Sequence, residues 1–313
     1  MPETPDAPTT LPEPDFLAKA PLAYLNPEFL DSPDGRLIRI MAEYQEPLVR
    51  FRRERIADTI VFFGSARFHA LDVATHELKT VGNTAPPAEQ AAGMAAVHMS
   101  HYYEDARTLA RLISTWSKAL PGPRHRFVVT SGGGPGIMEA ANRGAWEAGA
   151  KSIGLNIKLP FEQVPNPYIT PELNFEFHYF FMRKYWFAYL AKALVVFPGG
   201  FGTMDEMFEL LTLAQTNKLT KKMTVILYGT DYWKSAINFE FFAENGAIAP
   251  QDLDLFQFAD TPGHAFDLLK TGLTHHVEFQ DPHEAHENAP KVPTTPAPTA
   301  QDLLGPDINK TRP

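Results

Sequence analysis

Short apolar runs alternate with amphipathic stretches along most of the chain. The apolar runs are rich in β-branched and aromatic residues and have the length of buried strands. They cover residues 59–63, 126–130, 151–157, 193–197 and 223–228, and a shorter strand is expected over 174–178. Apolar residues at helical spacing predict helices over residues 36–55, 94–120, 137–149, 180–192, 203–217, 232–245 and 262–273. The pattern therefore alternates between strand and helix.

Such alternation predicts an α/β fold: a Rossmann-like, doubly wound parallel sheet with helices on both faces. In these sheets ligands bind beyond the carboxyl ends of the strands, where the strand order reverses. Three of the expected strands end in glycine, at Gly64, Gly132 and Gly199. We therefore expect a ligand site where these strand ends meet.

The two ends of the chain differ from its centre in composition. Many of the 28 prolines lie there, among threonine, alanine and aspartate. Such segments bury too little apolar surface to offset the entropy lost on ordering. We expect disordered segments at residues 1–23 and 274–313 around a single nucleotide-binding domain over 24–273, which begins with a helical extension. Residues 68–93 are polar, and we expect them to form an irregular insertion.

Charge and composition exclude several classes of protein. The formal net charge of −9 argues against a broad nucleic-acid surface. There is no cysteine, which excludes thiolate chemistry and is compatible with the cytoplasm. The acidic N-terminus does not resemble a signal peptide. The most apolar stretch, 179–197, contains Arg183, Lys184 and Lys192, so we expect no membrane span. The histidines lack metal-ligand spacing, and no metal is expected.

The first candidate binding element is the glycine turn Ser131–Gly136, which follows a strand and opens a helix. Glycines let the backbone approach a phosphate closely, and the free N–H groups of the helix point at it. The turn is not a Walker A loop, because no Gly-Lys-Ser/Thr follows, and it matches the dinucleotide fingerprint only loosely. The alternative is a purely structural tight turn that needs positive φ angles.

The second turn is Pro198-Gly-Gly-Phe-Gly-Thr203. Gly199, Gly200 and Gly202 expose backbone amides, and the Thr203 hydroxyl can bond a phosphate oxygen or cap the helix. Thr203-Met-Asp-Glu206 also fits the capping box, in which the glutamate folds back onto the threonine N–H. Glu206 is therefore either a structural cap or a catalytic carboxylate. Glutamine distinguishes the two, because it can cap but cannot act as a base.

Charged and polar side chains near these turns are further candidates. Arg183 lies in an aromatic segment, and we favour a phosphate or carboxylate partner for its guanidinium over exposure to solvent. For Lys184 alone, extension into solvent is the better interpretation. Asn142 follows the first turn by two helical turns and is a candidate ligand contact. Glu139 either contacts the ligand or complements the helix dipole.

Three segments together carry a resemblance to a known family. They are Gly132-Gly-Gly-Pro-Gly-Ile-Met138, Met182-Arg-Lys184 and Pro198-Gly-Gly-Phe-Gly-Thr-Met-Asp-Glu206. They resemble the LOG (LONELY GUY) family, whose members are nucleoside 5′-monophosphate phosphoribohydrolases that release cytokinin bases and were long labelled possible lysine decarboxylases. The likeness extends over about residues 59–273, and Ile60-Val-Phe-Phe-Gly-Ser65 matches the family's first strand and turn.

The resemblance implies a role for each matching position. Arg183 and Glu206 are expected to be catalytic. The 5′-phosphate and ribose are expected to lie against residues of the three strand ends and the helices beside them: Gly64, Ser65, Gly132, Gly133, Gly134, Gly136, Asn142, Lys184, Gly199, Gly200, Gly202 and Thr203. Shorter plant-type members carry other residues where this chain has Phe181-Met182, so it is more similar to a larger bacterial branch. Members are commonly dimers or larger, so a homo-oligomer is expected.

The expected activity is hydrolysis of the N-glycosidic bond of a nucleoside 5′-monophosphate, AMP or a cytokinin ribotide, to free base and ribose 5-phosphate. Glu206 stabilises an oxocarbenium-like ribose or orients the attacking water, and Arg183 holds the phosphate or positions Glu206. No cofactor is expected, because no convincing pyridoxal-phosphate lysine motif is present. The alternatives are a non-catalytic nucleotide or molybdenum-cofactor carrier on the same fold, and a dinucleotide-dependent oxidoreductase, which the missing acidic ribose contact disfavours.

Overall fold

A seven-stranded, wholly parallel sheet forms the centre of the molecule in the order β4-β3-β2-β1-β5-β6-β7. The computed structural model describes residues 20–82, 85–159, 164–216 and 223–278. The strands are β1 (Thr59–Phe63), β2 (Val128–Ser131), β3 (Ser152–Ile157), β4 (Asn174–Phe177), β5 (Ala191–Val196), β6 (Thr224–Tyr228) and β7 (Gln257–Ala259). The order reverses beside β1, which pairs with β2 on one side and β5 on the other.

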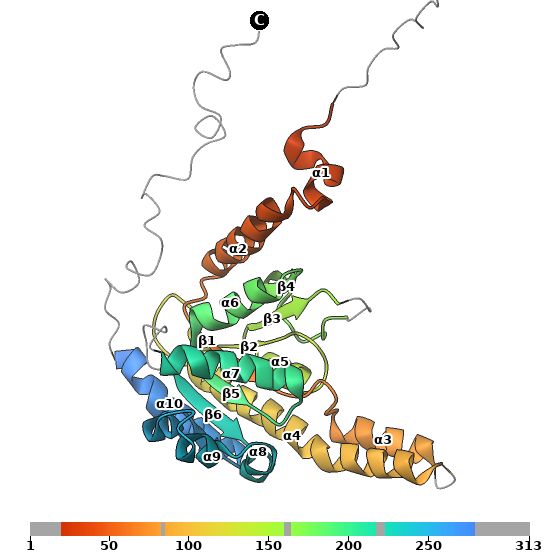
Figure 1. The fold of residues 1–313 in the computed structure, drawn as a ribbon. Helices are drawn as coiled ribbons and strands as arrows, with labels where there is room; N and C mark the ends of the chain where they lie inside the picture. The colour runs from red at the N-terminus through yellow and green to blue at the C-terminus, as the bar shows by residue number, and fades with distance from the viewer. Residues whose placement is uncertain (1–19, 83–84, 160–163, 217–222, 279–313) are drawn as a thin grey trace, which may run out of the picture.

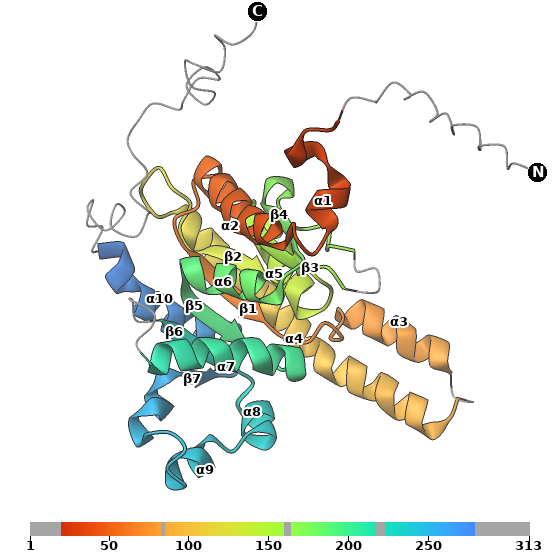
Figure 2. The ribbon, with the colours of Figure 1, turned by 45° about the horizontal axis from the view of Figure 1, so that its top comes forward.

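Helices cover both faces of this sheet (Figures 1 and 2). The helices are α1 (Pro27–Asp31), α2 (Arg36–Arg53), α3 (Leu71–Val81), α4 (Pro87–Lys118), α5 (Ile137–Glu147), α6 (Phe180–Leu190), α7 (Phe201–Gln215), α8 (Thr230–Ala236), α9 (Phe239–Glu244) and α10 (Pro262–Glu278). Short 3₁₀ turns occupy Ala23–Leu25, Pro171–Leu173 and Pro250–Leu255. The expected Rossmann-like α/β fold is confirmed.

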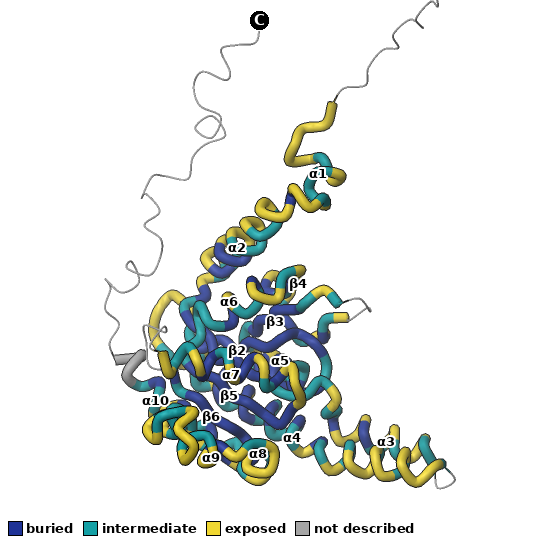
Figure 3. Tube along the Cα trace, in the orientation of Figure 1, coloured by how far each residue is buried: buried dark blue, intermediate teal, exposed yellow. Residues whose placement is uncertain are grey.

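Alternate residues of β1 point to opposite faces of the sheet, as the two-residue repeat of a strand requires, and they belong to two separate parts of the core. Val61 and Phe63 pack with residues of α2, α6 and α7, whereas Ile60 and Phe62 pack with residues of α4, α5 and α10. All five residues of β1 are buried, and Figure 3 shows the buried strands beneath more exposed helices. Two apolar layers therefore hold the central strand and fix the position of its carboxyl end.

The segment expected to be irregular, residues 68–93, is largely helical, and that expectation is wrong. It contains α3 and the start of α4, which lie side by side and project from the sheet (Figure 2). Ala74 of α3 is 1% exposed. Leu71, Ala74 and Leu78 lie at helical spacing in the sequence, but most of the residues between them are polar.

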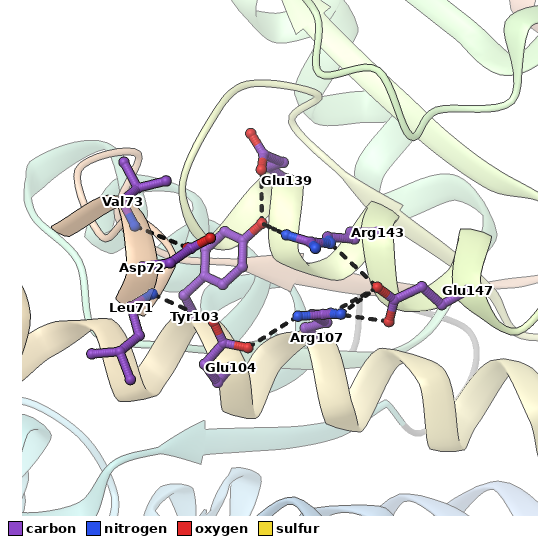
Figure 4. A network of polar contacts seen from close by, with 9 residues as sticks. All are labelled: Leu71, Asp72, Val73, Tyr103, Glu104, Arg107, Glu139, Arg143 and Glu147. Carbon is purple, nitrogen blue, oxygen red and sulfur yellow. Dashed lines mark hydrogen bonds and ion pairs between the residues drawn. The ribbon is translucent and has the colours of Figure 1, made fainter. Parts of the chain in front are cut away.

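A polar network fastens α4 to α5 (Figure 4). The Tyr103 hydroxyl donates to Glu139 Oε1 over 2.7 Å, and Arg143 Nη1 donates to the same hydroxyl oxygen over 3.5 Å. Arg107 and Arg143 both bond the Glu147 carboxylate. Glu139 is bonded to Tyr103. The network therefore holds α5, the helix that follows the first glycine turn, against α4.

Several element boundaries differ from the expected ones. The helix expected over 232–245 is two helices, α8 and α9, because the Asn238 side chain caps a new helix by accepting from Phe241 N. Strand β7 was not anticipated. Helix α10 continues to Glu278, beyond the expected end of the domain at 273, and a 3₁₀ turn begins at Ala23.

Residues 1–19 and 279–313, expected to be disordered, lie outside the described residues. Within the described part of the chain, no helix is both long and apolar enough to cross a bilayer.

Candidate active site at the carboxyl ends of β1, β2 and β5

The exit of β1 joins the two glycine turns. Ser65 N donates to Pro198 O at the start of the second turn over 3.0 Å, and Ser65 O accepts from Ile137 N, just after the first turn, over 3.0 Å. A Cβ at Gly64 would collide with the Ile137 side chain, so glycine is needed for this close approach. The three glycine-terminated strands expected to converge do so, at the point where the strand order reverses.

The first turn, Ser131–Gly136, is held from within the protein. Gly133 has a φ of 77° and Gly136 a φ of 68°, a region that favours glycine. Ser131 Oγ accepts from Gly133 N over 3.1 Å and donates to Asn142 Oδ1 over 2.7 Å. The structural reason for glycine therefore applies at these two positions, whatever ligand the turn binds.

Asn142 supports this turn from below. Its side chain is fully buried: Oδ1 accepts from Ser131 and from Asn166, and Nδ2 donates to Ile153 O over 3.2 Å. Every polar atom of the side chain is thus bonded within the protein. In this geometry Asn142 supports the turn, and a direct contact with ligand, as expected from the sequence, is not what its bonds favour.

The second turn has no capping box. Helix α7 begins at Phe201, its N-cap is Gly200, and no side chain caps it. Thr203 is therefore already inside the first turn of the helix, and its side chain lies against Gly199, where an added Cβ would collide with it. The capping alternative for Glu206 is wrong, because the helix starts earlier than the Thr-x-x-Glu pattern indicates.

Gly200 and Gly202 differ from the other glycines of the site. A Cβ added to either would meet no atom within 4 Å, and the φ of Gly200 is −88°. Neither internal packing nor backbone conformation therefore explains glycine at these positions. Both face the open side of the turn, where the first N–H groups of α7 have no intrahelical acceptor.

Glu206 points across to α6 instead of back along its own helix. Arg183 Nη2 donates to Glu206 Oε1 over 2.6 Å, and both side chains are largely buried, at 14% and 8% exposure. Among the described residues, Arg183 Nε has no hydrogen-bond partner. The Arg183 guanidinium lies 5.5 Å from the Phe180 ring centroid and 5.6 Å from that of Phe187. The expected carboxylate partner of Arg183 is therefore Glu206.

Burial raises the pKa of the Glu206 carboxyl, and the neighbouring charge and hydrogen bond of Arg183 only partly oppose this effect. The charge of Lys184 opposes it as well. A carboxyl group whose pKa is raised by desolvation and opposed by specific charged neighbours is typical of catalytic sites. The pair is thus electrostatically suited to acid–base or cation-stabilising chemistry.

Lys184 does not extend freely into solvent. Its Nζ lies 2.8 Å from Asp205 Oδ2 and 2.8 Å from Glu209 Oε2 on α7, and its side chain is 18% exposed. Burial lowers the pKa of Lys184, but the hydrogen bonds to Asp205 and Glu209 outweigh it, so that its pKa is raised overall. Arg183 and Lys184 together bind α6 to the turn of α7 that carries Glu206.

Sequence reasoning missed two residues that contact the turns. Asn166 donates to carbonyl oxygens of the first turn, and Tyr232 donates to Gly199 O of the second. Neither belongs to a recognisable pattern: Asn166 lies in a proline-rich loop and Tyr232 on α8. No group of three or more metal-ligating side chains occurs among the described residues.

Comparison with known proteins extends this picture. Residues 138–269, which include Arg183, the second turn and Glu206, match the family described as possible lysine decarboxylase. A probable cytokinin riboside 5′-monophosphate phosphoribohydrolase of Oryza sativa subsp. japonica is 26% identical over 160 residues, 48% of this chain and 70% of that protein. The resemblance to the LOG family is confirmed. A cytokinin riboside 5′-monophosphate phosphoribohydrolase of Rhodococcoides fascians is 30% identical over 126 residues, 39% of this chain and 62% of that one.

Solved structures are similar to this chain at lower identity. A molybdenum cofactor binding protein from Rippkaea orientalis is 19% identical, with a TM-score of 0.42, over 68% of this chain and 96% of that one. The molybdenum cofactor carrier protein of Chlamydomonas reinhardtii is 21% identical, with a TM-score of 0.42, over 69% and 99%. We draw no conclusion from likeness of this degree.

Proposed function

We propose that the chain is a nucleoside 5′-monophosphate phosphoribohydrolase, which hydrolyses the N-glycosidic bond of AMP or a cytokinin ribotide to free base and ribose 5-phosphate. The observation that carries the proposal is the buried Arg183–Glu206 pair, formed across α6 and α7 directly beside the second glycine turn. The names of the similar proteins from Oryza sativa and Rhodococcoides fascians agree with this reaction.

The phosphate end of the substrate is assigned to the glycine turns. The N–H groups that open α7 and the unobstructed faces of Gly200 and Gly202 suit a phosphate at a helix N-terminus. Binding of the phosphate then orients the ribose, so that energy from a remote part of the substrate contributes to catalysis at C1′.

Glu206 is assigned to the ribose. Cleavage of the C1′–N bond leaves positive charge on the ribose ring, which a carboxylate stabilises. Water adds to C1′; one of its protons is transferred to the departing base and the other stays on the new anomeric hydroxyl. Arg183 keeps the buried Glu206 ionised and directed at this position, because its guanidinium lowers the cost of charge on the carboxylate.

The test is incubation of the purified chain with AMP, other purine and pyrimidine monophosphates and a cytokinin ribotide, followed by chromatography for free base. Adenosine, which has the same base and ribose without the phosphate, is the matched substrate control. We expect base release from at least one monophosphate and much slower release from adenosine. No release from any monophosphate, with binding retained, would contradict the enzyme and favour the non-catalytic carrier.

A further inference from the structure

The carbonyl groups of the first glycine turn are held by one side chain. Asn166 Nδ2 lies 3.0 Å from Gly133 O, 3.1 Å from Gly134 O and 2.9 Å from Asn142 Oδ1, and the Asn166 main-chain N–H donates to Gly133 O over 2.8 Å. Asn166 Oδ1 accepts from Tyr168 N over 3.2 Å, which fixes the amide with its NH₂ toward the turn. Asn166 is 7% exposed, so these bonds form away from water.

The second turn has the same arrangement with a different donor. The Tyr232 hydroxyl donates to Gly199 O over 3.1 Å. Its neighbour Trp233 is fully buried, and its indole N–H is shared between Val196 O and Tyr228 O. The Tyr232 ring packs against that of Trp233 with centroids 5.4 Å apart. The donor is therefore anchored to the end of β5, immediately before the turn that it holds.

The geometry of the peptide bond fixes the direction of the N–H groups that follow these two carbonyl groups. In a trans peptide the C=O and the N–H of one unit point in opposite directions. When Gly133 O is held toward Asn166, the N–H of Gly134 must point away from it. When Gly199 O is held toward Tyr232, the N–H of Gly200 must do the same. Neither N–H has an acceptor among the residues that the structure describes.

We propose that Asn166 and Tyr232 are positioning residues, which hold the two glycine turns so that the N–H groups of Gly134 and Gly200 are directed at the substrate phosphate. The inference rests on the proposed function, because it needs a phosphate-bearing ligand at the turns. Orientation before binding removes an entropic cost that a free turn would meet on each encounter with ligand. The assignment adds two residues, from a loop and from α8, to a site otherwise built from α6, α7 and the strand ends.

The test compares binding of AMP, inorganic phosphate and adenosine by calorimetry in Asn166→Ala and Tyr232→Phe, each combined with Glu206→Gln so that AMP is not consumed during the titration; KM and kcat are measured in the single variants. The second variant removes a single hydroxyl, so it keeps the test valid if the first is poorly folded. Loss of the single hydroxyl bond in Tyr232→Phe should weaken AMP and phosphate binding by about threefold to tenfold. Asn166→Ala removes several side-chain bonds and should weaken both at least as much. Adenosine binding should stay unchanged, and KM for AMP should rise more than kcat falls.

Two matched variants control for general loosening. Ser152→Ala removes a bond to Tyr168 O in the same loop as Asn166 without contacting the turn. Tyr228→Phe removes a buried tyrosine hydroxyl bonded to Asp105. Both should leave AMP affinity unchanged. Equal weakening of AMP and adenosine, or unchanged AMP affinity in Tyr232→Phe, would overturn the assignment. A wild-type chain that binds AMP no more tightly than adenosine would instead contradict the proposed function.

Discussion

Arg183 and Glu206 form a buried ion pair of 2.6 Å between two helices that follow different strands. The pair brings together the two residues that the resemblance implies to be catalytic, which lie 23 positions apart in the sequence. It also removes the local explanation for Glu206, since a carboxylate bonded to Arg183 and carried on the second turn of α7 does not cap that helix. The remaining explanation is chemical, and it makes several predictions.

Gly202→Ala should preserve the fold and weaken the binding of the substrate. Alanine is favoured over glycine inside a helix, and the new methyl group meets nothing within 4 Å. Against a bound phosphate it would displace a charge-assisted hydrogen bond and raise KM for AMP about tenfold. The matched control is Gly263→Ala, at the corresponding position of α10 and equally unobstructed. An unchanged KM in Gly202→Ala would show that no ligand approaches this turn.

Arg183→Met should destabilise the chain at neutral pH by about 3 kcal/mol, because it leaves a buried carboxylate without its partner. The loss should shrink as the pH falls, since Glu206 can then take up a proton. Urea denaturation at two pH values measures both effects. Lys151→Met breaks the more exposed pair with Glu54 and should change the unfolding free energy far less. Equal losses in the two variants would argue that Arg183 does not compensate a buried charge.

The raised pKa of Glu206 predicts the acidic limb of the pH–rate profile. If Glu206 acts as a carboxylate, kcat/KM should fall as the pH drops through its pKa, above the value of about 4.3 for an ordinary glutamate. Arg183→Lys keeps the charge but not the guanidinium geometry, and it should move this limb to still higher pH. An acidic limb at the pKa of an ordinary glutamate would show that the ionisation of Glu206 does not control kcat/KM.

The same raised pKa has a consequence for stability. The folded chain holds the Glu206 proton more tightly than the unfolded chain, so the contribution of this group is fully present below the unfolded pKa. It is lost as the pH rises through the folded pKa. The wild type should therefore lose unfolding free energy relative to Glu206→Gln as the pH rises through this window. A pH-independent difference would contradict the raised pKa.

The alternation of strands and helices was predictable because apolar periodicity is local and strong. Every strand of the sheet except β7, only three residues long, follows from it. Helix α3 was missed because its apolar positions lie among polar residues, although Ala74 is buried. The division between α8 and α9 depends on one capping asparagine, Asn238, within an otherwise helical pattern.

The site was predictable only where a motif spans it. The glycine turns, Arg183 and Glu206 follow from strings of neighbouring residues, and the comparison supports the family that those strings resemble. The capping interpretation of Thr203 and Glu206 was equally local, and the observed start of α7 at Phe201 and the distant Arg183 contact both decide against it. Asn166 and Tyr232 reach the turns through tertiary packing alone, and no spacing along the chain connects them with the glycines.

The most direct test of the central claim is turnover of AMP by Glu206→Gln beside the wild type, with free base measured by chromatography. Glutamine keeps the size of the side chain and can still accept from Arg183, so the melting temperature should change little. Turnover should fall by at least about a hundredfold, the scale of a positioned acid–base group. A correctly folded Glu206→Gln that releases base at the wild-type rate would contradict the catalytic role of Glu206.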